Sequence, residues 1–139
     1  MDASGNLEKL KAFFGRQDFV RVAYIFGSFA EGRQGPLSDM DFAVLLDKKL
    51  SRKEITRRKM LLVNEISSIM RTDNFDIVVM NEASILMNFN IISKGKALKA
   101  GRERVPLEMR IMSGYLDRKY YDDLNASITL EKISREGIL

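Results

Sequence analysis

The hydrophobic positions follow two different periods along the chain, which predicts strands alternating with helices. Runs rich in β-branched and aromatic residues predict strands at Val20–Phe26, Asp39–Leu46 and Phe75–Met80. Apolar residues at helical spacing predict helices at Leu7–Phe14, after Ser51, from Ile85 to about Gly95, and from Pro106 onward. Strands separated by helices indicate an α/β arrangement, with one layer of sheet covered by helices.

The segment that begins at Ser51 carries a clear helix signal. Ser51 followed by Glu54 has the form of a capping box, in which Ser51 caps the helix and Glu54 reaches back. The apolar stripe that follows consists of Ile55, Leu62, Ile66 and Ile69. Its opposite side is basic, with Arg52, Arg57, Arg58 and Lys59. That side is either a solvated helix face or a surface for RNA or an acidic partner.

The last predicted helix has two features with open alternatives. Leu107, Ile111 and Tyr115 repeat every four residues, which predicts a buried stripe. Tyrosines at 115, 120 and 121 are either contacts for a partner or packing of this helix onto the sheet. The segment after Leu124 is either more helix or a tail that orders on binding.

Length and composition restrict the chemistry. The 139 residues predict a single domain over 1–139, with a core at about 20–100 and a C-terminal helical segment at about 103–139. The chain has no cysteine and no histidine, which excludes disulfides, thiolate nucleophiles, imidazole bases and cysteine or histidine metal sites. Catalysis would therefore depend on carboxylates, hydroxyls, lysine, arginine and bound metal ions.

The charge balance and the termini bear on partner and location. The net charge of +4 favours an anionic partner, such as nucleotide phosphates, nucleic acid or an acidic protein surface, but a solvated surface explains it equally well. No apolar run is long enough to span a bilayer, so no membrane partner is expected. Residues 1–5 lack the charged and apolar regions of a secretory signal, and we expect a cytoplasmic protein.

The segment from Gly27 to Asp41 carries the chemistry. Gly27-Ser28 ends a predicted strand and opens a turn, where backbone N–H groups and a hydroxyl can hold phosphate. Ten residues later, Asp39 and Asp41 lie at i and i+2 of the next strand, so both project from one face. Two adjacent carboxylates repel each other unless a cation lies between them, and hard oxygen ligands suit Mg²⁺ or Mn²⁺.

A strand aspartate is costly without a purpose, which favours function over a surface turn. Asp41 lies between Met40 and Phe42 inside a predicted strand. Asp76 repeats this pattern between Phe75 and Ile77. Both aspartates are candidate site residues on these grounds.

The spacing Gly27-Ser28, ten residues, Asp39-x-Asp41, with the later Asp76, resembles the nucleotidyltransferase superfamily of DNA polymerase β-like folds. The phrases Phe26–Gly32 and Ser38–Phe42 resemble its minimal nucleotidyltransferase (MNT) branch, and within it the MntA-type adenylyltransferase antitoxins encoded beside HEPN-domain ribonuclease toxins. The resemblance is strongest from about Tyr24 to Met80. It implies an α/β (α+β) nucleotidyltransferase fold, with a small mixed sheet covered by helices and a C-terminal helix.

The resemblance also implies roles for individual residues. Asp39, Asp41 and Asp76 would be catalytic and would hold two Mg²⁺ or Mn²⁺ ions. The nucleotide-binding positions would be Gly27, Ser28, Arg33 and Ser38. The sequence departs from the family at Glu31, where a basic residue is common, and Arg33 is the candidate substitute for that charge.

The activity that the resemblance implies is transfer of AMP from ATP to a tyrosine hydroxyl of a HEPN toxin, in a hetero-oligomer with that toxin. With this activity, we expect the positive net charge to serve the binding of triphosphate and of an acidic protein partner, rather than direct binding of nucleic acid. Two alternatives stay open: a protein that neutralises a toxin by masking it, and a transferase that acts on a small-molecule hydroxyl. The small-molecule enzymes of this superfamily usually carry an additional substrate domain.

Overall fold

A four-stranded mixed sheet forms the centre of the molecule, in the order β3-β2-β1-β4. The structure, a computed structural model, describes residues 3–27 and 40–136. Its elements are α1 (Ala3–Gly15), β1 (Val20–Phe26), β2 (Met40–Leu46), α2 (Arg52–Met70), β3 (Phe75–Val79), α3 (Ile85–Lys94), β4 (Lys96–Lys99) and α4 (Arg104–Glu136). β1 is antiparallel to both β2 and β4, whereas β2 and β3 are parallel. The expected α/β fold with a mixed sheet and a C-terminal helix is confirmed.

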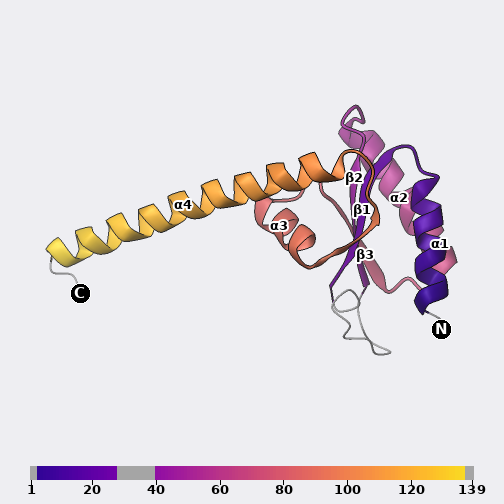
Figure 1. Cartoon of the computed structure of the whole chain (residues 1–139), viewed down its shortest axis with the longest axis horizontal. Helices are drawn as coiled ribbons and strands as arrows, with labels where there is room; N and C mark the ends of the chain where they lie inside the picture. The colour runs from indigo at the N-terminus through magenta and orange to yellow at the C-terminus, as the bar shows by residue number, and fades with distance from the viewer. Residues whose placement is uncertain (1–2, 28–39, 137–139) are drawn as a thin grey trace.

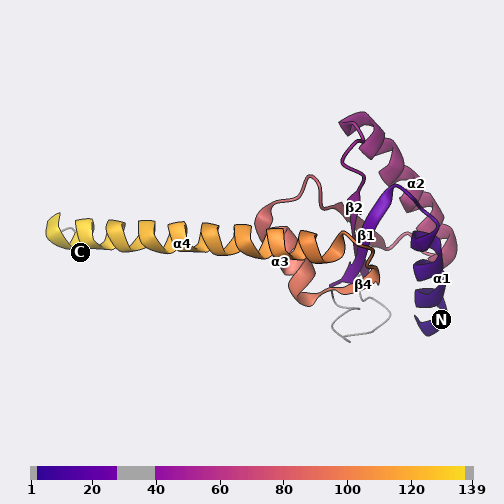
Figure 2. The ribbon, with the colours of Figure 1, turned by 45° about the horizontal axis from the view of Figure 1, so that its top comes forward.

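The two faces of the sheet are covered by different helices (Figures 1 and 2). α1 and α2 pack on one face, where Phe14, Phe42 and Leu62 are fully buried. α3 and the first part of α4 pack on the other face, over Tyr24, Ala43 and Ile111. The strand residues alternate between these two layers, as the period of two in the sequence predicts. Burial on both faces explains why β1 reads as an almost continuous apolar run.

The start of α2 confirms the predicted cap. The Ser51 Oγ accepts a hydrogen bond of 3.2 Å from the Glu54 backbone N–H, and it donates one of 3.1 Å to Glu54 Oε1. Glu54 therefore reaches back to the Ser51 hydroxyl. One residue of the predicted stripe differs: Met70 is buried at the end of the helix, whereas Ile69 is half-buried and packs at the border of the core.

β4 is a strand that the hydrophobic pattern does not predict. α3 ends at Gly95 as expected, and the next four residues pair with β1 through Tyr24–Ala97 and Ile25–Lys96. A Cβ at Gly95 would lie 2.5 Å from the Ile91 carbonyl oxygen. The glycine therefore allows the chain to turn from α3 directly into the sheet edge.

α4 begins on the sheet and then leaves it (Figure 1). Leu107 and Ile111 are buried, and the Tyr115 ring stacks on Phe89 of α3 with 3.7 Å between ring centroids. Every residue from 116 to 132 is exposed. The segment after Leu124 is thus a continuation of the helix, to Glu136. In the part of the chain that is described, no helix is both long and apolar enough to cross a bilayer.

Candidate active site

The candidate site lies at one end of the sheet, where β1 ends and both β2 and β3 begin. Because β2 and β3 are parallel, their first residues lie side by side, and Asp41 is paired in register with Asp76. Because β1 runs antiparallel to β2, its last residue Phe26 is paired with Asp41. Gly27 follows directly and ends the first described segment. The strand pairing thus brings together three segments that are far apart in the sequence.

Asp41 and Asp76 project from the same face of the sheet. In-register neighbours on adjacent strands are separated by about 4.8 Å of backbone, and their side chains share a face. This is the face that α3 and α4 cover, because Ala43 and Val78, two residues farther along each strand, both pack in that layer. Asp41 is half-buried and Asp76 is exposed. One carboxylate therefore lies within the fold while its neighbour faces solvent.

Gly27 makes room for the Asp41 carboxylate. Its backbone φ is +86°, a left-handed conformation that residues other than glycine rarely adopt. A Cβ at this position would lie 2.7 Å from Oδ2 of Asp41, closer than atoms of this kind approach. The carboxylate of residue 41 thus lies in the space that a side chain on residue 27 would need. Gly27 is required here by both conformation and space.

The chemistry of these donors fits a divalent cation. Two carboxylates on neighbouring strands raise each other's energy when both are ionised, and a cation between them removes that cost. Carboxylate oxygens are the ligands that Mg²⁺ and Mn²⁺ prefer. Among the described residues, no three carboxylates gather in one cluster. Asp41 and Asp76 alone supply two of the three aspartates that the sequence proposes.

The other proposed site residues lie outside the described part of the chain. They are Ser28, Arg33, Ser38 and Asp39, and Glu31 lies there too. Their roles in nucleotide and metal binding stay predictions. Of the proposed set, the sheet brings together Gly27, Asp41 and Asp76.

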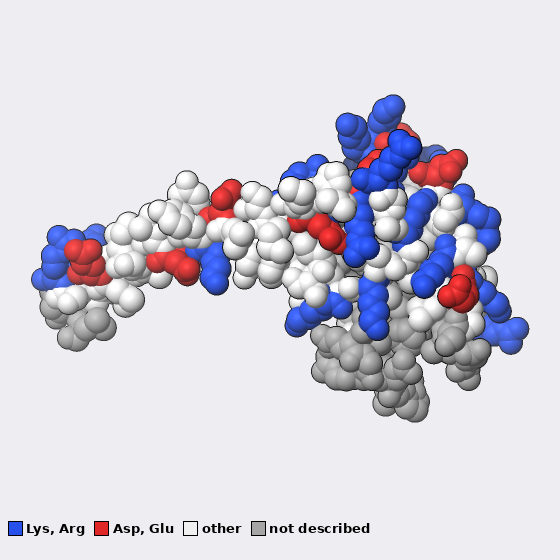
Figure 3. Space-filling view, viewed as in Figure 1, with Lys and Arg blue, Asp and Glu red and all other residues white. Residues whose placement is uncertain are grey.

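The basic and aromatic segments of the sequence have separate locations. Figure 3 shows Lys and Arg side chains gathered over the globular part, whereas the projecting length of α4 carries side chains of both charges, separated by uncharged surface. The basic side of α2 is exposed, and Arg58 lies over the Phe19 ring at 4.8 Å from its centroid. Tyr115 packs against α3, whereas Tyr120 and Tyr121 are exposed on α4. Tyr115 therefore packs within the fold, on α3 rather than on the sheet, and a partner contact at Tyr120 and Tyr121 stays a prediction.

The comparisons with known proteins agree on the fold. A family profile described as "Polymerase beta, Nucleotidyltransferase" matches residues 8–104. A chain in a crystal structure of a toxin–antitoxin complex with AMP-PNP is similar with a TM-score of 0.68 and 20% identity, over 93% of this chain and 99% of that one. No protein of curated function matches the sequence.

Two further solved structures are similar over nearly the whole chain. One is the toxin–antitoxin pair MntA–HepT, with a TM-score of 0.64 and 19% identity over 91% of this chain and 98% of that one. The other contains a tri-AMPylated HEPN toxin from Shewanella oneidensis with an MNT antitoxin, with a TM-score of 0.63 and 18% identity over 91% and 98%. At these identities the likeness shows the shared fold. The profile match covers most of the chain, and the aspartate pair lies at the starts of β2 and β3. The chain therefore belongs to the polymerase β nucleotidyltransferase family.

Proposed function

We propose that this protein is a metal-dependent nucleotidyltransferase that transfers AMP from ATP to a tyrosine hydroxyl of a HEPN-domain ribonuclease toxin, and so acts as its antitoxin. The observation that carries the proposal is the in-register pairing of Asp41 with Asp76, beside the Gly27 backbone. Family membership supports nucleotidyl transfer. The AMP-PNP complex and the AMPylated toxin among the similar structures support ATP and a protein acceptor.

The reaction is a substitution at the α-phosphorus of ATP. The tyrosine oxygen forms a bond to that phosphorus, the bond to the bridging oxygen of the β-phosphate breaks, and pyrophosphate leaves. Asp41 and Asp76, together with Asp39, would hold two Mg²⁺ or Mn²⁺ ions. When bound, such ions neutralise the charge of the triphosphate and of the leaving pyrophosphate.

The residues at the strand ends have distinct tasks in this scheme. Asp76 is exposed, so it can orient the incoming hydroxyl and accept its proton. Asp41 is half-buried, and its carboxylate lies in the space that the absent side chain of Gly27 leaves. The Gly27 backbone, with Ser28, Arg33 and Ser38, would bind the phosphates. With no histidine in the chain, carboxylates are the available bases.

The projecting part of α4 supports a protein partner. Large apolar side chains recur every three or four residues along one side of α4 and form an exposed stripe, Met109, Met112, Leu116, Tyr120 and Leu124, of which the last three lie on the projecting part. Their exposed fractions range from 42% to 68%. A helix face of this kind is typical of a surface that packs into a groove of another protein. We propose that this α4 stripe contacts the toxin in a hetero-complex.

The same stripe favours a second candidate function, in which the protein neutralises the toxin by binding alone. A helix that extends beyond its own domain can cover a partner's active site without any chemistry. The two functions differ in whether ATP and the aspartates are needed. Neutralisation that persists without either would identify masking.

The test is to incubate the protein with ATP, Mg²⁺ and the product of the adjacent gene as the candidate HEPN acceptor, and to measure that acceptor by mass spectrometry. We expect a mass gain of AMP on a tyrosine peptide, which EDTA abolishes. Asp41→Asn should abolish transfer, whereas Glu65→Gln, an exposed carboxylate on the outer side of α2, should not change it. No transfer, together with full neutralisation by Asp41→Asn, would overturn the enzymatic proposal in favour of masking.

A further inference from the structure

A pocket lies at the opposite end of the sheet from the aspartates. It has a volume of about 680 Å³ and lies between the end of β2, the start of α3 and the start of α4. Leu46, the last residue of β2, is five residues beyond Asp41, and strands rise about 3.3 Å per residue, so this end is about 17 Å from Asp41. The pocket is within the size range of small-molecule sites. It is therefore separate from the site proposed for ATP.

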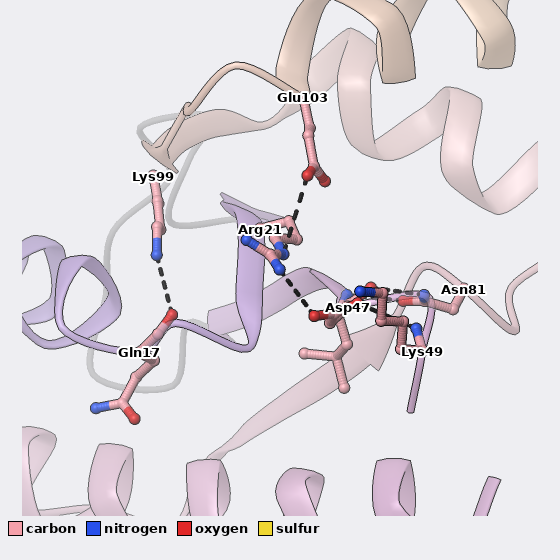
Figure 4. Close-up of polar contacts among 8 residues, drawn as sticks. Gln17, Arg21, Asp47, Lys49, Asn81, Lys99 and Glu103 are labelled. Carbon is pink, nitrogen blue, oxygen red and sulfur yellow. Dashed lines mark hydrogen bonds and ion pairs between the residues drawn. The ribbon is translucent and has the colours of Figure 1, made fainter. Parts of the chain in front are cut away.

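The rim of this pocket is strongly basic. Five Lys and Arg side chains line it against two carboxylates: Arg21, Lys48, Lys49, Arg102 and Arg110 against Asp47 and Glu103. Arg21 forms ion pairs with both carboxylates, at 2.7 Å from Asp47 and 3.9 Å from Glu103 (Figure 4). Within the described residues, Lys48, Arg102 and Arg110 form no ion pair. The rim thus offers free positive charge to an incoming anion.

The start of α4 adds to this positive field. The helix begins at Arg104, between the lining residues Glu103 and Pro106, and runs for 33 residues. Pro106 has no N–H and Leu107 donates to Glu103, so within the described chain the free N–H groups of this first turn are those of Arg104 and Val105, which carry a partial positive charge. Free cations beside such a turn form a site for a phosphate group.

The floor of the pocket has a different character from its rim. Met80, Ile85, Leu107 and Ile111 line it with apolar surface. Asn88 lies among them, 9% exposed, and its Nδ2 donates to the Met80 carbonyl oxygen at 3.1 Å. Its Oδ1 is buried and has no hydrogen-bond partner among the described residues. A ligand with an apolar body would match this floor.

We propose that this pocket binds a phosphorylated small molecule with an apolar or aromatic body, the class that includes mononucleotides. The phosphate would lie between Lys48, Arg102 and Arg110 at the start of α4, and the body would lie on the apolar floor. The site is distinct from the aspartate site in location and needs no metal. The proposal does not depend on the proposed function, because it concerns binding in the absence of toxin, ATP and Mg²⁺.

The test is a titration of the full chain with AMP in EDTA, followed by NMR of labelled Ile, Leu and Met methyl groups. We expect shifts at Ile85, Leu107 and Ile111, with Met40, beside Asp41 at the aspartate end, unchanged. Arg110→Glu should weaken AMP binding by about tenfold or more, since it replaces a cation by an anion at the rim. The matched control Arg118→Glu, eight residues along the same helix and outside the pocket, should bind as the parent does. Both positions are exposed, and the unliganded methyl spectra report whether each variant is folded.

Several outcomes would overturn the proposal. These are shifts at Met40 alone, no binding at millimolar AMP, or equal weakening by Arg110→Glu and Arg118→Glu. A single-stranded oligonucleotide whose affinity rises with its length would instead assign the basic rim to nucleic acid. A comparison of AMP with ribose 5-phosphate distinguishes nucleotides from sugar phosphates: tighter binding of AMP supports a base on the apolar floor, and equal binding overturns that role. The readouts are methyl groups of the pocket, measured in EDTA without toxin, so failure of the transferase proposal leaves this result unaffected.

Discussion

Oδ2 of Asp41 occupies the space in which a side chain on residue 27 would begin, because a Cβ on Gly27 would lie only 2.7 Å from it. Gly27→Ala must therefore displace the carboxylate and also strain a backbone at φ +86°. We expect a loss of about 1–3 kcal/mol in the free energy of unfolding. AMP transfer should fall by about tenfold or more, since the displaced carboxylate could no longer ligate metal in place.

A matched control for this variant is Gly15→Ala, at the end of α1. A Cβ there would meet nothing within 4 Å, and the backbone φ is not left-handed. Urea unfolding should show it to be neutral or slightly stabilised, because alanine favours helix over glycine by up to about 1 kcal/mol. If both variants lost the same stability, contact with Asp41 would not be the reason.

The exposed aspartate allows chemistry to be separated from folding. Asp76 faces solvent, so Asp76→Asn should leave the midpoint of thermal unfolding within about 2 °C of the parent. The proposed transfer should nevertheless fall by at least about a hundredfold, because a metal ligand and proton acceptor is lost. Mass spectrometry of the acceptor measures the transfer. Unchanged transfer would remove Asp76 from the site.

Tyr24 connects the centre of the sheet to α4. Its hydroxyl donates a hydrogen bond of 2.8 Å to Glu108, which also accepts one of 3.0 Å from Arg104. Tyr24→Phe should cost about 1 kcal/mol in the free energy of unfolding at neutral pH, because Glu108 keeps its bond to Arg104. Urea unfolding measures this difference. A cost near zero would mean that Glu108 pairs with Arg104 equally well alone.

The same tyrosine predicts a pH dependence on the alkaline side. Burial, and then the hydrogen bond and negative charge of Glu108, raise the pKa of Tyr24 well above its ordinary value. A raised folded pKa favours the neutral phenol, so its stabilising contribution is complete below about pH 10 and is lost as pH rises above that value. The parent should therefore lose more stability than Tyr24→Phe between about pH 9 and pH 11. Parallel slopes for the two proteins would contradict this origin.

The α4 stripe can be tested against the opposite side of the same helix. Leu116→Glu combined with Tyr120→Glu places charge on an apolar contact surface and should weaken toxin binding by about a hundredfold. Asn125→Glu adds the same kind of charge on the opposite side of the helix from Leu116, and this variant should bind the toxin as the parent does. Calorimetry or gel filtration of the pair gives the affinity. All three positions are exposed, so the fold of the free protein should not change.

Where local pattern and tertiary environment agreed, the sequence predicted the fold well. β1 has the predicted bounds because its apolar run is buried on both faces. Asp41 and Asp76 drew attention because a charged residue at a strand start needs a reason, and the structure pairs them in register. β4 has no comparable signal: Lys96–Lys99 is a short segment at the sheet edge, and its pairing with β1 depends on where α3 ends.

The basic pocket could not have been found from sequence. Its cations come from the start of β1, the loop after β2 and the start of α4, at Arg21, Lys48 and Arg110. No spacing rule relates these positions, because only the strand order brings them to one end of the sheet. The sequence instead draws attention to the basic run of α2, which lies exposed on the opposite layer.

The continuity of α4 gives the molecule a mechanical lever. The helix starts at the basic pocket, rests on α3 at Tyr115, and then extends for about 30 Å without further support from the fold. If the helix tilted by about 5° at Tyr115, its far end would move by about 3 Å, roughly the length of a hydrogen bond. A small displacement of the first turn would thus be amplified along the apolar stripe. Contact made at the tip would, by the same geometry, act back on the end that lines the pocket.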